Sequence, residues 1–233
     1  MSPAQRLSVL DRTFLDFESD AYPQHVGATL IFETGPLRNP AGGVDAERVR
    51  NHIASRLHRI PRYRQRLAWI PIEGHPVWVD DDRFNIHYHV RHAALPKPGS
   101  ERQLKRLAAR IMSQRLDYGK PLWELWVIEG LDGDRAALIS KTHHCMIDGI
   151  AGVDLLTILL SPDPDDEAEA APRWLPEKPP SPLELAGAEV WRRATMPITA
   201  VRGLAAAAQK PAETIARVRE QAGAVIEALG AGM

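Results

Sequence analysis

The segment from His143 to Gly149 holds residue types that can move a proton near neutral pH. Two adjacent histidines, His143 and His144, are followed by Asp148 one helical turn after the second, and then by Gly149. An imidazole has an unperturbed pKa of about 6.5, and a well-placed general base accelerates a reaction by roughly 10²–10⁴-fold. The sequence therefore predicts proton abstraction here, with His144 as the base.

The other residues of this segment have roles that their types alone leave open. Asp148 can orient the imidazole directly, or it can pair with an arginine and hold the turn in shape. Gly149 permits a sharp or crowded backbone at the motif. In the alternative interpretation the histidines do no chemistry and Asp148 only caps a helix.

A β-hairpin and a helix are expected to position this segment. Residues 125–128 are apolar, β-branched or aromatic, residues 132–134 form a turn signal, and residues 136–144 read as a returning strand. Side-chain alternation puts Leu138, Ser140, Thr142 and His144 on one face, and Ala137, Ile139, Lys141 and His143 on the other. The two histidines should therefore point in opposite directions, just before a helical pattern that continues to Leu160.

The rest of the first 160 residues alternates between strand and helix patterns. Asp45 and the pair Ser100 and Gln103 are predicted helix caps. The predicted strands are 26–32, 67–72, 77–79 and 84–90, and the predicted helices are 46–57, ending near Pro61, and 101–116. This order predicts one α/β lobe, a mixed sheet flanked by helices, over residues 1–160.

The remainder of the chain has a different composition. Residues 161–182 contain seven prolines among acidic residues, which predicts an extended linker. Residues 183–233 are alanine-rich with helical periodicity, and Pro197 and Pro211 should break this region into amphipathic helices. We expect these helices to pack against a partner lobe, with docking on a lipid surface as the alternative.

Composition excludes several classes of protein. With 233 residues, 44% apolar content and a net charge of −1, the chain can build one sizeable core and has no basic bias that points to nucleic acid. Its one cysteine excludes an internal disulfide framework. No signal-peptide pattern and no apolar run near 18 residues is present, so we expect a cytoplasmic protein.

Two further histidines and the cysteine have ordinary interpretations. His87 and His89 alternate onto one face of a predicted strand and could join His143 or His144 at a metal, but a third ligand is missing. We interpret that face as solvated and expect no metal site. Cys145 should point away from His144, so we interpret it as a packed residue, not as a nucleophile.

Three segments, in order and with similar spacing, resemble a known family. They are Leu7–Leu15 with His25–Ala28, Pro121-Leu122-Trp123 with Ile128–Leu131, and Lys141–His144 with Asp148 through Gly152. Over most of residues 5–160 the chain resembles the amino-terminal half of the bacterial wax ester synthase/diacylglycerol O-acyltransferase family. That family belongs to the CoA-dependent acyltransferase superfamily, and the resemblance implies a chloramphenicol-acetyltransferase-like lobe.

The resemblance implies a reaction and roles for individual residues. His144 would deprotonate a fatty alcohol or diacylglycerol, and the alkoxide would attack an acyl-CoA thioester to give a wax ester or triacylglycerol and CoA. Asp148 would be structural and His143 secondary. The segment Pro121, Leu122 and Trp123 would shape the acyl channel or support it, although simple core packing of Trp123 is equally open. Acyl-CoA is a substrate, and no cofactor is expected.

An arginine-rich run after the first predicted helix also has two interpretations. The run could attract the phosphates of CoA, but a solvated basic face is the ordinary explanation. Its members are Arg56, Arg59, Arg62, Arg64 and Arg66.

The resemblance also implies a missing partner. Full members of the family continue with a second lobe of similar size, so we expect a carboxy-terminal lobe as a separate chain or a missing segment. This chemistry is also compatible with peripheral contact of the chain with the inner membrane or with lipid bodies. Two other functions stay open: a condensation domain of peptide synthetases, which shares the doubled histidine with Asp-Gly, and a non-catalytic lipid-binding fragment.

Overall fold

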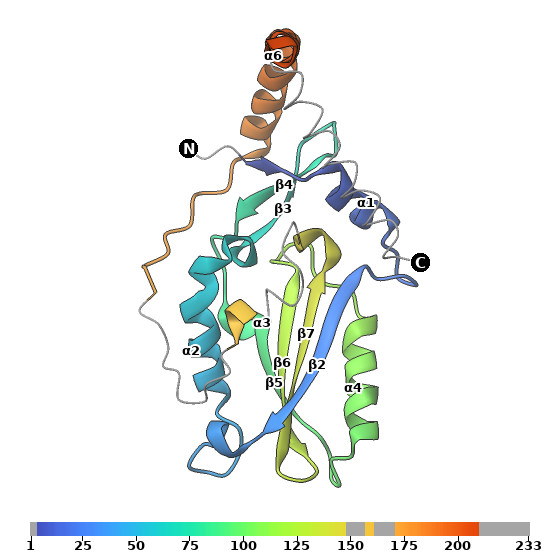
Figure 1. The fold of residues 1–233 in the computed structure, drawn as a ribbon, viewed down its shortest axis with the longest axis vertical. Coiled ribbons are helices and arrows are strands. Elements are labelled where there is room, and N and C mark those ends of the chain that lie inside the picture. The colour runs from blue at the N-terminus through green and yellow to red at the C-terminus, as the bar shows by residue number, and fades with distance from the viewer. Residues whose placement is uncertain (1–3, 148–156, 161–170, 210–233) are drawn as a thin grey trace. The chain divides into compact units, whose positions relative to one another are not determined.

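A four-stranded sheet carries the histidine pair in this computed structural model, which describes residues 4–147, 157–160 and 171–209, with side chains described up to residue 195 (Figure 1). The strand order is β2-β7-β6-β5. The strands span His25–Glu33 (β2), Arg135–His143 (β7), Trp123–Leu131 (β6) and Val90–Ala94 (β5). Neighbours are antiparallel except β5 and β6, which are parallel, so the sheet is mixed as predicted.

Helices cover both faces of this sheet. Figure 1 shows α2 (Ala46–Arg56) and α4 (Glu101–Ser113) at opposite sides of it. One apolar cluster includes Ile53 of α2, and the other packs Ile111 of α4 beneath the sheet. On β7, Ala137 and Ile139 belong to the α4 side and Leu138 to the α2 side, which confirms the predicted alternation.

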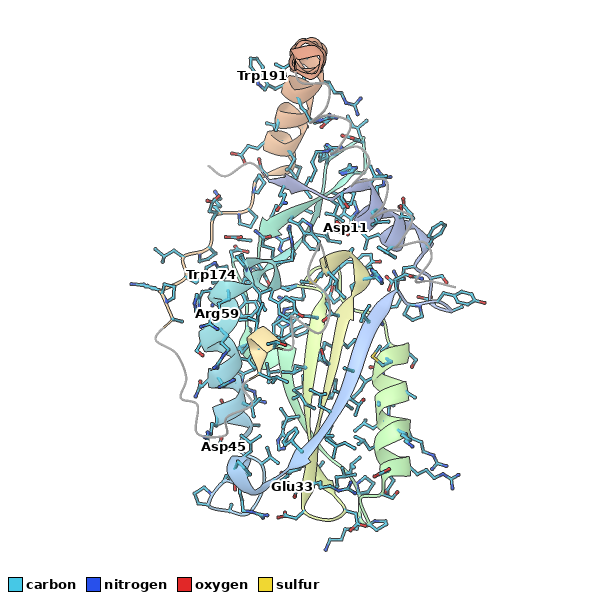
Figure 2. All side chains as sticks on the ribbon, viewed as in Figure 1. Asp11, Glu33, Asp45, Arg59, Trp174 and Trp191 are labelled. Atoms are coloured by element: carbon cyan, nitrogen blue, oxygen red, sulfur yellow. The ribbon has the colours of Figure 1, made fainter. Side chains whose placement is uncertain are left out.

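The helix signals in the sequence correspond to real caps. Asp45, labelled in Figure 2 at the start of α2, accepts a hydrogen bond from the backbone N–H of Arg48. Ser100 and Gln103 form the predicted capping box of α4, which ends at Ser113, three residues before the predicted end. These local hydrogen bonds fix where each helix starts.

A second, smaller sheet lies beside the first helix of the chain. It has the order β1-β4-β3, with β1 at Gln5–Arg6, β3 at Gln65–Trp69 and β4 at Pro76–Asp80. Helix α1 (Val9–Phe17) follows β1, and Ser8 caps it by accepting from the N–H of Asp11. Short 3₁₀ turns complete the lobe, at Gly35–Leu37 (η1), Leu57–Arg59 (η2), Pro61–Arg64 (η3) and His144–Met146 (η4).

The predicted strand over residues 84–90 is wrong. Asn85 caps a one-turn helix, α3 (Ile86–His89), by accepting from the N–H of His87, and β5 begins only at Val90. A side chain that satisfies a backbone N–H two residues later stabilises a turn, and this local hydrogen bond wins over strand periodicity.

Among the described residues, 180–209 and the turn 70–74 form a second compact unit. Its helix α6 (Pro182–Gln209) begins with a capping box in which Ser181 and Glu184 bond each other's backbone N–H. The predicted break at Pro197 does not occur, because α6 continues through it. A proline inside a helix removes one backbone hydrogen bond and can kink the helix without ending it, and α6 is a long helix of 28 residues. Pro211 lies outside the described residues.

None of the helices in the described part of the chain combines the length and the apolar character that crossing a membrane requires.

Gly99 ties the start of α4 to the hairpin that carries the histidines. Its φ is +77°, its carbonyl accepts from the N–H of Asp132 at 2.8 Å, and a Cβ placed there would lie 1.9 Å from the carbonyl oxygen of Gly130. Only glycine fits both the backbone angle and this close approach.

We therefore expect Gly99→Ala to lower the free energy of unfolding by about 2 kcal/mol or more, through strain and the backbone clash. Chemical denaturation followed by circular dichroism measures this change. Gly35→Ala is the matched control, because nothing lies within 4 Å of its Cβ position. Equal stability of the two variants would contradict this account of the junction.

Candidate active site

The two histidines lie where the central strand β7 ends. His143 is the last residue of β7, and His144 is the first residue of the 3₁₀ turn η4. The turn forms because the Nδ1 atom of His143 accepts from the N–H of Cys145 at 3.2 Å, as a helix cap does. Asp148 and Gly149, the other motif residues predicted from the sequence, lie outside the described residues.

His144 is half-buried and is held from two sides. Its ring stacks on Phe14 of α1 with 3.8 Å between ring centroids, and its backbone N–H donates to the carbonyl of Gln24 at 2.8 Å. Figure 2 labels Asp11 on α1, the helix that packs on this turn. The Nδ1 atom of His144 is buried, with no hydrogen-bond partner among the described residues.

His143 has a different environment from His144. Its side chain has no solvent exposure, and burial lowers the pKa of His143 to about 4, with Glu18 opposing that shift and His25 adding to it. Because Nδ1 accepts a hydrogen bond, the neutral ring carries its proton on Nε2. His143 is therefore uncharged near neutral pH and closed to a substrate.

A buried carboxylate, Glu18, faces both His143 and His25. Its Oε1 lies 3.6 Å from Nε2 of His143 and 3.5 Å from Nε2 of His25, the residue opposite His143 in the β2–β7 register. Glu18 was not among the site residues predicted from the sequence. Its partners Arg115 and Tyr118 lie almost 100 positions away, so no local pattern identifies it.

The segment Pro121, Leu122 and Trp123 is buried beside the histidines. The carbonyl of Leu122 accepts from the N–H of His143 at 2.9 Å, and Trp123 stacks between Tyr63 and His89. The indole N–H of Trp123 also donates to the carbonyl of Tyr63. These contacts favour the interpretation of this segment as packed support, while a channel role stays a prediction.

The solvated histidine face does not exist as predicted. His87 is largely exposed on α3, but His89 is fully buried, its Nδ1 donates to the carbonyl of Trp123 at 2.8 Å, and burial lowers its pKa to about 4. The interpretation was wrong because α3 replaces the expected strand. Within the described residues no group of three ligand-type side chains could hold a metal ion.

The arginine-rich run does not form one solvated face either. Arg56 and Arg64 are buried, and Arg64 donates to the carbonyl of Ala54 and lies over the ring of Trp174, a residue labelled in Figure 2. Arg62 lies over Trp78. Packing of the guanidinium groups on indole rings and backbone carbonyls accounts for much of this basic composition.

Comparison with known proteins shows the family of this chain. Residues 7–231 match the wax ester synthase/diacylglycerol acyltransferase catalytic domain. The chain belongs to this wax ester synthase/diacylglycerol acyltransferase family. Among curated relatives, a probable diacylglycerol O-acyltransferase of Mycobacterium tuberculosis, tgs3, is 38% identical over 181 residues, which are 77% of this chain and 65% of that protein.

Solved structures confirm the predicted fold class for this member of the acyltransferase family. The wax ester synthase/diacylglycerol acyltransferase of Marinobacter aquaeolei VT8 matches with a TM-score of 0.56 and 32% identity, over 70% of this chain and 40% of that one. A starter condensation domain of rhizomide synthetase shares the fold, with a TM-score of 0.52, at 12% identity over 68% of this chain and 36% of that one. The chain thus spans less than two thirds of the length of these relatives.

Cys145 offers a direct test of how closed this acyltransferase-family turn is. It is the single cysteine of the chain, it is fully buried, and burial raises the pKa of its thiol. Because the thiolate is the reactive form, we expect a disulfide reagent to modify the native chain on the order of 10²-fold more slowly than the denatured chain. Absorbance of the released thiolate measures both rates, with Cys145→Ala as the blank. Equal rates would contradict the buried turn.

Proposed function

We propose that this chain is the part of an O-acyltransferase that supplies the general base, and that the base is His144. The reaction moves a long-chain acyl group from acyl-CoA to the hydroxyl of a fatty alcohol or of a diacylglycerol. Membership of the family supports the reaction class, as do the names of the relatives.

One observation supports the choice of His144 over His143. The two adjacent rings differ in access: His143 is fully buried with both ring nitrogens turned toward protein groups, whereas His144 is half-buried at the strand end. Within His144, Nδ1 is buried, so a substrate hydroxyl can approach only Nε2. A base must reach the proton that it removes, and geometry therefore favours Nε2 of His144.

The proposed chemistry follows from this arrangement. Nε2 takes the hydroxyl proton as the oxygen attacks the thioester carbonyl, and the tetrahedral intermediate then expels the sulfur of CoA. The proton held by His144 goes to that leaving sulfur, which gives an ester and free CoA. Stacking on Phe14 fixes the plane of the ring during both transfers. Asp148 would support the turn or orient the ring, as the sequence suggests.

The two other functions considered from the sequence have less support. The likeness to the condensation domain concerns the fold alone, because only 12% of the aligned residues are identical. A lipid-binding fragment without catalysis would not need an accessible imidazole at the end of a strand. Acyl transfer therefore remains the proposal.

We also propose that residues 1–160 act with a carboxy-terminal lobe, and that residues 161–182 and 183–233 form the linker and connector to it. The relatives extend well beyond the matched part. Long acyl chains need a tunnel that is enclosed on both sides and excludes water. Peripheral contact of the chain with a lipid surface also stays a prediction, because the proposed substrates are lipids.

We expect His144→Ala to lower the turnover number by about 10²-fold or more, because it removes the proton acceptor. The assay measures CoA release from a long-chain acyl-CoA with a fatty alcohol or diacylglycerol, for the chain alone and with the carboxy-terminal lobe supplied.

The matched control is His87→Ala, which removes an imidazole on α3 whose side chain is 58% exposed. This variant should keep normal turnover. Near-normal turnover of His144→Ala would contradict the assignment of the base.

A further inference from the structure

Glu18 is a charged side chain that the fold buries completely and surrounds with donors. It follows the last residue of α1, and its Oε2 accepts from the hydroxyl of Tyr118 and from Nη2 of Arg115 at 3.1 Å. Its Oε1 accepts from the N–H of Gln24 at 3.3 Å. Burial raises the pKa of Glu18, but the hydrogen bonds from Tyr118, Gln24 and Arg115 and the nearby His143 outweigh it and lower the pKa overall. The carboxylate is therefore ionised near neutral pH.

Two routes connect this carboxylate to His144. Through the first, Oε1 lies 3.6 Å from Nε2 of His143, an electrostatic contact beyond hydrogen-bonding distance. The Nδ1 atom of the same ring accepts from the N–H of Cys145 inside the turn that His144 begins. Through the second, Gln24 donates its N–H to Oε1 of Glu18 and accepts the N–H of His144 at its carbonyl. The backbone of Gln24 and the ring of His143, the two groups that hold His144 in these contacts, therefore both depend on the carboxylate of Glu18.

The tautomer of His143 fits this arrangement. The ring of His143 can accept at Nδ1 only when its proton is on Nε2, the atom that faces Glu18. The carbonyl of Met112 can only accept, so His25 carries a proton on Nδ1, which lies 3.1 Å away. The Nε2 atom of neutral His25 is then bare and faces Oε1 of Glu18 at 3.5 Å without a hydrogen bond, so Glu18 does not stabilise the tautomer of His25. A carboxylate attracts an Nε2–H and repels a bare Nε2 lone pair, so it selects the His143 tautomer that caps the turn.

We infer that Glu18 is a positioning residue for the proposed base, which it holds in place by fixing the tautomer of His143 and the backbone of Gln24. The inference rests on the proposed function. Glu18 does not contact the substrate; it acts through groups that hold the turn. The guanidinium of Arg115 neutralises the charge of Glu18, and the hydroxyl of Tyr118 donates to the same carboxylate.

The test compares Glu18→Gln with Asp16→Asn in the full chain, with the carboxy-terminal lobe supplied for turnover. Asp16 is two residues away on α1, its side chain is 61% exposed, and it pairs only with Arg12 among the contacts of the described residues. Long-range proton–nitrogen correlation spectra of the chain labelled with ¹⁵N-histidine show which ring nitrogen of His143 carries the proton. Initial rates at varied acceptor concentration give kcat and KM separately.

For Glu18→Gln we expect the Nε2–H signal of His143 to be lost or mixed. The side chain of glutamine is uncharged and brings an NH₂ group, a further donor among groups that already donate, so the attraction that favours a proton on Nε2 of His143 is lost. We expect kcat to fall about tenfold or more with a small change in KM, as misplacement of a catalytic group predicts. Asp16→Asn should change neither. If Glu18→Gln does not fold, Tyr118→Phe removes one donor to the carboxylate, keeps the aromatic ring, and should shift both readouts in the same direction by less.

An unchanged His143 tautomer in Glu18→Gln would overturn the inference, and so would a changed tautomer with normal kcat. The two readouts also separate this inference from the proposed function. If the unmodified protein shows no acyl transfer, the function is wrong, while the tautomer spectra still decide whether Glu18 sets the state of His143.

Discussion

A carboxylate can stay ionised inside a protein only where hydrogen-bond donors replace the water that it loses, and this requirement shapes the whole histidine turn. Glu18 meets it with the hydroxyl of Tyr118 and the guanidinium of Arg115, which belong to one segment, and with the backbone N–H of Gln24, which belongs to another. Removing one partner of such a group leaves an uncompensated charge, which is why single changes there should affect distant residues. The turn that carries His144 inherits its geometry from this cluster.

The sheet brings these parts together. The β2–β7 register sets His25 opposite His143, and Lys141, fully buried two residues earlier, donates to the carbonyls of Ile111 and Gln114 at the end of α4. An ammonium group that satisfies the last carbonyls of a helix anchors that helix to the strand. The end of β7 is therefore braced by α4 on one face, by α1 beyond its end and by β2 at its edge.

Local patterns predicted the parts of the fold that local hydrogen bonds decide. The capping box at Ser100, the hairpin around the turn at 132–134 and the opposite directions of side chains along β7 are confirmed. Predictions failed where another interaction outweighed periodicity, as at Asn85, and at Pro197, where the long helix α6 continues through the proline. Glu18 could not be found from sequence, because its role arises from residues about 100 positions apart that only the tertiary fold brings together.

His143 is a buried, neutral support and His144 is the proposed base, and the protonation of His143 tests this division of roles most directly. An NMR pH titration of the ¹⁵N-labelled imidazoles measures it in the intact chain. Burial lowers the pKa of His143 to about 4, so its ring should stay neutral from pH 8 down to about 5. A titration of His143 near the ordinary value of about 6.5 would show a ring open to water, and would contradict the account.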